Sequence, residues 1–269
     1  MIPAPFDYVA AESTTHALDL LGSLGEDAKL LAGGHSLLPM MKLRLAAPSV
    51  LVDIGRLTEL TGIRAEGDEI VIGAATPHAM LATSELVRAD APLLAHSAGR
   101  VGDPQIRHRG TIGGSLAHAD PAADLPMALV ALGGSVDVLG RDGTRRVAAG
   151  DFFTGFFETS LEPDELIAAV RVPRRPGAGW GYQKFVRRAN DWAIVGVAAI
   201  DGRIALANMG PTPLRARAAE QALAGGASVA DAAELAAEGT EPGEDVHADR
   251  DYRRHLARVL VRRALEQRT

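Results

Sequence analysis

The sequence predicts an α+β protein in which two lobes are followed by a further small α+β unit. Helical and strand-like segments alternate along the 269 residues, the early strands are continuous and apolar, and the later strands are short and joined by tight turns. Hydrophobic residues make up 47% of the chain and charged residues 23%, which is typical of a globular protein.

The first lobe is expected over residues 1–55. Ser13 precedes an amphipathic segment that Gly25 terminates, a pattern that indicates a capped helix. Residues 28–32 form a short buried strand. A helix over 35–45 follows, in which Pro39 is tolerable because it falls in the first turn. Residues 49–54 make a continuous, β-branched strand of the kind that parallel sheets bury on both faces.

The second lobe, residues 56–175, is expected to hold a mostly antiparallel sheet. Thr76 and Pro77 indicate the cap and first residue of a helix. The predicted strands and helices of this lobe are strands 60–64, 69–73, 135–139, 144–148 and 165–172, and helices 92–101 and 121–132.

A linker rich in proline and glycine, residues 174–179, indicates a domain boundary, so we expect a second domain over 178–269. Its predicted elements are strands 180–186, 193–200 and 203–207 and helices 214–223, 229–238 and 249–268.

Composition excludes several functions. The absence of cysteine excludes disulfides and thiolate-bound clusters in this chain, and the net charge of −6 argues against nucleic acid. No apolar run is long enough to cross a membrane, and no signal peptide is evident. We therefore expect a cytoplasmic protein, which partners could bring to the inner membrane. The histidines lack metal-ligand spacing, and no nucleophile elbow surrounds Ser36 or Ser115.

Two glycine pairs are the main functional signal. Ala32-Gly33-Gly34-His35-Ser36 joins a predicted strand to a helix, and Thr111-Ile112-Gly113-Gly114-Ser115 repeats the pattern later in the chain. Glycines let a backbone approach a ligand closely, and N–H groups at a helix start can converge on an anion. The alternatives are an ordinary turn for the first pair and a sheet bend for the second. Together they suggest a diphosphate-containing cofactor, although the common dinucleotide fingerprint is not complete.

These motifs, with the segments 119–126 and 182–193, resemble the FAD-binding medium subunit of molybdenum hydroxylases, most nearly the medium chain of aerobic carbon monoxide dehydrogenases within the xanthine dehydrogenase family. The resemblance covers nearly the whole chain. It implies a two-lobed FAD-binding domain of the vanillyl-alcohol-oxidase type, followed by a small flavoprotein domain.

The resemblance also implies roles for individual residues. The backbones of 32–36 and 111–115 would hold the pyrophosphate and ribityl parts of FAD, and Asp124 would accept hydrogen bonds from cofactor hydroxyls. Ile167 would touch the flavin, Lys184 would place a cation near its ring, and Trp192 would shield one face. The ordinary alternatives are an aspartate that caps a helix or forms a surface salt bridge, a plain strand isoleucine, a solvated lysine and a core tryptophan.

The function implied is electron transfer. An iron–sulfur small subunit would deliver electrons from a molybdopterin large subunit to FAD here, within a dimer of heterotrimers, and no side chain of this chain would act in acid–base catalysis. Arginines along 250–268 suggest a docking face for an acidic partner. The alternatives are a stand-alone flavin oxidoreductase and a non-catalytic FAD-binding module. Neither the substrate of the holoenzyme nor the electron acceptor follows from the sequence.

Overall fold

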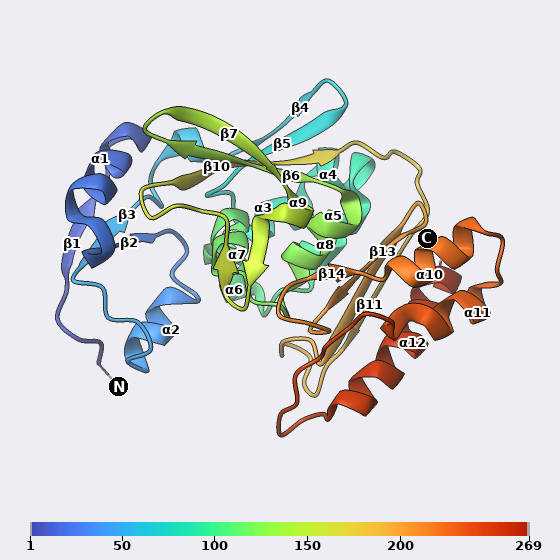
Figure 1. The fold of residues 1–269 in the computed structure, drawn as a ribbon. Coiled ribbons are helices and arrows are strands. Elements are labelled where there is room, and N and C mark those ends of the chain that lie inside the picture. Colours follow the sequence, from blue (N-terminus) through green and yellow to red (C-terminus); the bar gives the residue numbers. More distant parts are fainter. Residues whose placement is uncertain (1, 268–269) are drawn as a thin grey trace.

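The computed structural model describes residues 2–267, and its first lobe is a small parallel sheet with two helices (Figure 1). The strand order is β1-β3-β2. The elements are β1 (Asp7–Ala10), α1 (Thr14–Leu24), β2 (Ala28–Leu31), α2 (Leu37–Lys42) and β3 (Val50–Asp53). Ser13 caps α1 as predicted, because its Oγ accepts a hydrogen bond of 3.0 Å from the His16 N–H.

The second lobe is a five-stranded antiparallel sheet with helices on one face. Its order is β4-β5-β10-β6-β7. The strands are β4 (Ile63–Glu66), β5 (Glu69–Gly73), β6 (Ser135–Gly140), β7 (Gly143–Ala148) and β10 (Leu166–Pro173). Between β5 and β6 come α3 (His78–Thr83), α4 (Glu85–Asp90), α5 (Pro92–Gly99), α6 (Pro104–Arg109), α7 (Ile112–His118) and α8 (Asp124–Leu132), and between β7 and β10 come α9 (Ala149–Phe152), β8 (Phe153–Gly155) and β9 (Glu158–Thr159).

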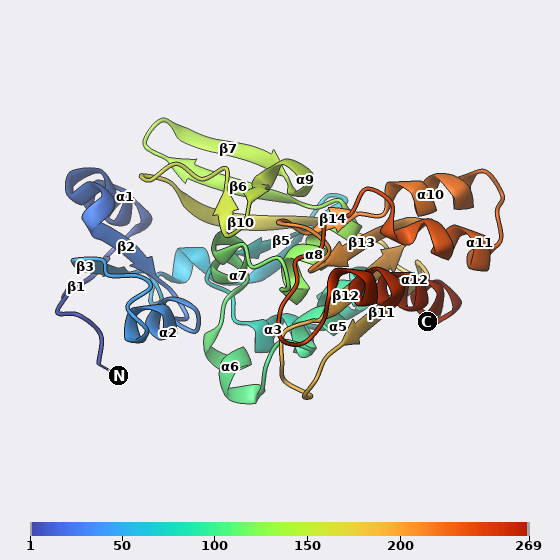
Figure 2. The same cartoon turned by 60° about the horizontal axis from the view of Figure 1, so that its bottom comes forward.

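The C-terminal unit contains a four-stranded antiparallel sheet (Figure 2). Its own helices cover one face of this sheet, and α5 and α8 of the second lobe pack against the other. Its elements are β11 (Trp180–Phe185), β12 (Val195–Ile200), β13 (Arg203–Ala207), β14 (Leu214–Arg215), α10 (Arg217–Ala224), α11 (Val229–Glu234) and α12 (Arg250–Gln267). Alternate residues of β12 pack into two different hydrophobic cores, one on each face of the sheet. Val195 and Val197 pack with the α12 side, whereas Ala198 and Ile200 join the core that contains α8. Every residue of β12 is therefore buried.

Several predicted boundaries are corrected, and three of them have a clear physical cause. The strand expected at 60–64 begins at Ile63, because Thr58–Leu60 forms a 3₁₀ turn that buries Leu60. Thr76 does not cap a helix: its hydroxyl donates to the Gly62 carbonyl at 3.2 Å and accepts from the Gly62 N–H at 3.0 Å. Pro77 is extended, and α3 begins one residue later. The helix expected to reach residue 45 ends at Lys42, since Arg44 adopts a left-handed conformation.

Several short elements are absent from the sequence predictions. β1 is largely exposed and has no apolar pattern, α4 and α6 have six residues each, and β8, β9 and β14 have two or three. Segments this short carry little periodicity. The α+β class itself is confirmed. Arg268, predicted to end the last helix, lies outside the described residues. Within residues 2–267, no helix is both long enough and apolar enough to cross a membrane.

Candidate functional site

A cleft of about 710 Å³ lies where the two lobes and the C-terminal unit meet. Its lining comes from the loop between β2 and α2, from α7, from β10 and from the β11–β12 segment. All predicted site residues except Ile112 line this cleft. Ile112 is 1% exposed and belongs to the core of the second lobe. The volume lies within the range of ligand-binding pockets.

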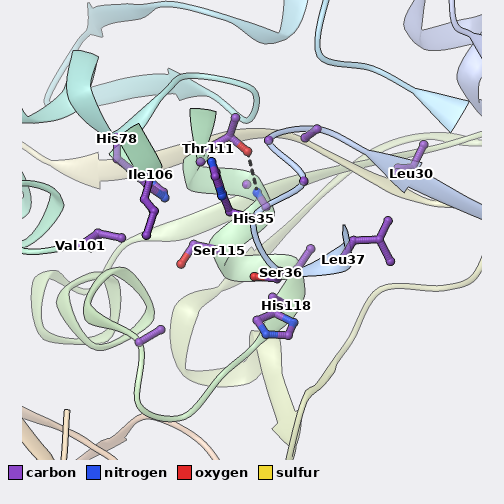
Figure 3. A pocket seen from close by; sticks show the side chains of 18 of the residues that line it. Leu30, His35, Ser36, Leu37, His78, Val101, Ile106, Thr111, Ser115 and His118 are labelled. Atoms are coloured by element: carbon purple, nitrogen blue, oxygen red, sulfur yellow. Dashed lines mark hydrogen bonds between the residues drawn. The ribbon is translucent and has the colours of Figure 1, made fainter. Parts of the chain in front are cut away.

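The first glycine segment forms the loop that Figure 3 shows around His35. Gly34 has a φ of +75°, a conformation that favours glycine. At position 33 only glycine fits, because any Cβ there would clash with the carbonyl oxygen of Arg109 at 2.2 Å. Among residues 2–267, nothing accepts a hydrogen bond from the N–H groups of Gly33 to Ser36. These donors are therefore available to a ligand in the cleft.

The second glycine segment is built differently. Gly113 and Gly114 lie in the first turn of α7, which Thr111 caps by accepting from the Gly114 N–H at 3.1 Å. The Ile112 and Gly113 N–H groups donate to the carbonyls of Thr76 and Ala74, and the Ser115 N–H donates to Thr111. The expectation of two equal backbone cradles is thus corrected. Within residues 2–267, the loop after β2 has free N–H groups, whereas the N–H groups at the start of α7 are already bonded. The start of α7 contributes the hydroxyl groups of Thr111 and Ser115 to the cleft instead (Figure 3).

Asp124 and Lys184 form a buried ion pair in the cleft wall. The Lys184 Nζ lies 2.8 Å from Asp124 Oδ2, and both side chains are 3% exposed. The Tyr182 hydroxyl donates to the other carboxylate oxygen. Burial raises the pKa of Asp124, although Lys184 and Tyr182 act in the opposite direction. Burial and the neighbouring carboxylate hold the pKa of Tyr182 well above its ordinary value. The alternative of a solvated strand lysine is therefore wrong.

Ile167 and Trp192 both line the cleft and come from different elements. Ile167 is buried on β10, where the pairing with β6 shifts register between Ile167 and Ala169. Such bulges redirect side chains next to functional sites. Trp192 lies in the segment between β11 and β12 and is 53% exposed. Trp192 is therefore not a core tryptophan, and its ring is accessible to a ligand.

The cleft also contains residues that sequence reasoning did not assign to it, among them His78, Ile106, His118 and Phe157. His118 and Phe157 have ring centroids 4.9 Å apart, and burial lowers the pKa of His118. No spacing in the sequence connects these residues, because packing of separate elements brings them together. Among residues 2–267, no three His, Asp or Glu side chains gather as metal ligands would.

The fold and cleft place the chain in a defined class. Residues 4–175 match the family of the FAD binding domain in molybdopterin dehydrogenase. Residues 180–268 match the CO dehydrogenase flavoprotein C-terminal domain. The chain belongs to this family of FAD-binding flavoproteins, which confirms the resemblance seen in the sequence and FAD as the cofactor.

Individual relatives are similar in sequence to this chain over nearly their whole length. The chain is 46% identical to the carbon monoxide dehydrogenase medium chain of Hydrogenophaga pseudoflava, over 98% of this chain and 97% of the relative. It is 41% identical to the 6-hydroxypseudooxynicotine dehydrogenase complex subunit alpha of Paenarthrobacter nicotinovorans, covering 98% and 95%. A solved chain of the Hydrogenophaga carbon monoxide dehydrogenase superposes with a TM-score of 0.95 at 48% identity, covering 99% and 98% of the two chains.

Proposed function

We propose that this chain is the FAD-carrying electron-transfer subunit of a molybdenum-containing dehydrogenase. Its partners would be an iron–sulfur small subunit and a molybdopterin large subunit, assembled as a dimer of heterotrimers in the cytoplasm. Residues 1–175 would form the FAD-binding domain and residues 178–269 the flavoprotein domain. Relatives of similar identity act in carbon monoxide and nicotine-related dehydrogenases, so the proposal leaves the substrate open.

The observation that carries the proposal is the loop after β2. Four consecutive N–H groups, from Gly33 to Ser36, remain available in a cleft of dinucleotide size. Convergent backbone donors favour an anion such as a pyrophosphate. Thr111 and Ser115 supply hydroxyls from the opposite wall. The donor set therefore fits the phosphate-containing part of FAD.

The remaining cleft residues suit the flavin part. We assign to Lys184 the role of a fixed cation, which Asp124 and Tyr182 hold in one position. Ile167 offers an apolar surface and Trp192 an accessible ring. When bound, FAD would accept single electrons and release pairs. The side chains would orient and shield the cofactor rather than transfer protons.

Flavin retention tests the binding loop. In the Gly34→Val variant the branched side chain is strained at a φ of +75° and lies close to Leu38, so we expect the purified protein to lose its absorbance at about 450 nm. Gly177→Val is the matched control. Its φ is +73°, nothing lies within 4 Å of the added Cβ, and it should retain flavin. Stoichiometric flavin in the Gly34→Val protein would refute the assignment of this loop.

Partner dependence tests the electron-transfer role. The flavin should be reduced rapidly only when the chain is copurified with its iron–sulfur partner, and metal analysis of that complex should find iron and molybdenum. Rapid reduction of the isolated chain by a soluble donor would instead favour a stand-alone oxidoreductase.

A further inference from the structure

His78 is a buried polar side chain in the cleft wall to which no role has been assigned. It is the first residue of α3 and is 4% exposed. Its N–H donates to the Gly110 carbonyl at 2.9 Å, and both His78 and Gly110 line the cleft. Figure 3 shows His78 beside Ile106 on the wall near His35.

Over the described part of the chain, the imidazole makes no hydrogen bond that accounts for its burial. Its Nδ1 is enclosed and unpaired among residues 2–267. An unpaired buried acceptor is tolerated more often than an unpaired N–H. We therefore place the proton on Nε2, which makes this nitrogen the donor.

The Nε2 edge of the ring lies over Gly110. A Cβ at Gly110 would stand 2.8 Å from Nε2 and 2.9 Å from Cδ2. Gly110 in turn lies under Gly33, because a Cβ at Gly33 would be 2.8 Å from the Gly110 Cα. Gly110 is therefore close both to the Nε2 edge of the ring and to the loop after β2, and all three line the same cleft.

The electrostatic surroundings of His78 favour an anion. Burial first, and then the neighbouring His35 and Arg107, lower the pKa of His78 to about 4. These two groups, from the loop after β2 and from α6, are the charged or titratable groups that act on the ring. The imidazole is therefore neutral at physiological pH, and it lies where basic side chains would stabilise a negative charge.

We propose that His78 is a cofactor-positioning residue whose Nε2–H donates a hydrogen bond to the pyrophosphate of FAD, beside the N–H groups of the Gly33–Ser36 loop. The inference rests on the proposed function, since it requires FAD in this cleft. It adds a side-chain donor from α3 to the backbone N–H groups of Gly33–Ser36 and the hydroxyls of Thr111 and Ser115. It also explains why a polar ring occupies a position that an apolar side chain could fill.

Amide substitutions test which nitrogen acts. The side-chain nitrogen of glutamine can replace Nε2, whereas that of asparagine reaches only the position of Nδ1. The full-length chain is freed of flavin, and dissociation constants are measured for FAD and for ADP, which keeps the pyrophosphate and lacks the flavin. The variants are His78→Gln, His78→Asn and His78→Phe, with exposed His108→Asn on α6 as the control. Circular dichroism and unfolding midpoints establish that each variant is folded.

We expect the His78→Gln and control proteins to bind both ligands within about threefold of the wild type, and the Asn and Phe variants to bind both about tenfold or more weakly. The ³¹P resonances of bound FAD should shift in the Asn variant and not in the Gln variant. Equal binding by the Gln and Asn variants, whether tight or weak, overturns the proposal. So does a loss of FAD affinity without a loss of ADP affinity. A wild-type chain that binds no FAD would remove the proposed function together with this inference.

Discussion

Replacing Lys184 by methionine should strongly destabilise the chain, because it leaves the buried carboxylate of Asp124 without its cation. The two side chains are each 3% exposed and their charged atoms are 2.8 Å apart. Removing one partner of a buried pair costs about 3–5 kcal/mol of the free energy of unfolding. For a chain of this size, the unfolding midpoint should fall by on the order of 10 °C.

Thermal and urea unfolding of the full-length chain without added FAD measure this effect. Lys42→Met is the matched control, because Lys42 is exposed in the last turn of α2 and its loss should change the midpoint little. Removing both charges, with Asp124→Asn and Lys184→Met together, should restore about half or more of the lost stability. The reasoning is refuted if Lys184→Met is no more destabilising than the control, or if the double variant equals the sum of the single losses.

The pH dependence of the Lys184→Met variant tests whether the lost stability comes from the negative charge on Asp124. Burial already raises the pKa of Asp124, and loss of the ammonium group should raise it further. When a carboxyl group has a higher pKa in the folded than in the unfolded state, the protein becomes less stable as the pH rises from the unfolded-state pKa to the folded-state pKa. The deficit against the wild type should therefore be smaller at about pH 5 than at about pH 8.

Three other outcomes follow from the packing and burial of single residues. Gly113→Ala places a Cβ 2.6 Å from that of Ala74 and should cost about 1–3 kcal/mol in urea unfolding. Because the pKa of His78 is lowered to about 4, stability should fall by about 3 kcal/mol as pH drops from about 6.5 to 4, and His78→Gln should abolish this part of the acid dependence. Trp192→Ala should leave the unfolding midpoint nearly unchanged, since the ring is 53% exposed, but weaken FAD binding in a fluorescence titration.

The sequence predicted the larger elements because their patterns are local. A serine cap, an amphipathic repeat and a terminal glycine define α1, and the apolar run of β12 reflects burial on both faces. It did not predict α4 or α6, whose six residues are too few to show a period. Thr76 was misassigned as a cap because its hydroxyl bonds to Gly62, a partner that only the β4–β5 hairpin supplies.

The two glycine pairs and the family resemblance, which the chain carries in its own residues, determined that a phosphate-containing cofactor, FAD, belongs to this protein. Tertiary structure alone decided how the pairs differ. Gly33 and Gly34 leave their N–H groups open, whereas those of Gly113 and Gly114 are bonded inside the chain. It also brought His78 against Gly110 and paired Asp124 with Lys184. Hydrogen-bond partners and burial depend on which distant segments meet, and no local pattern of residues contains that information.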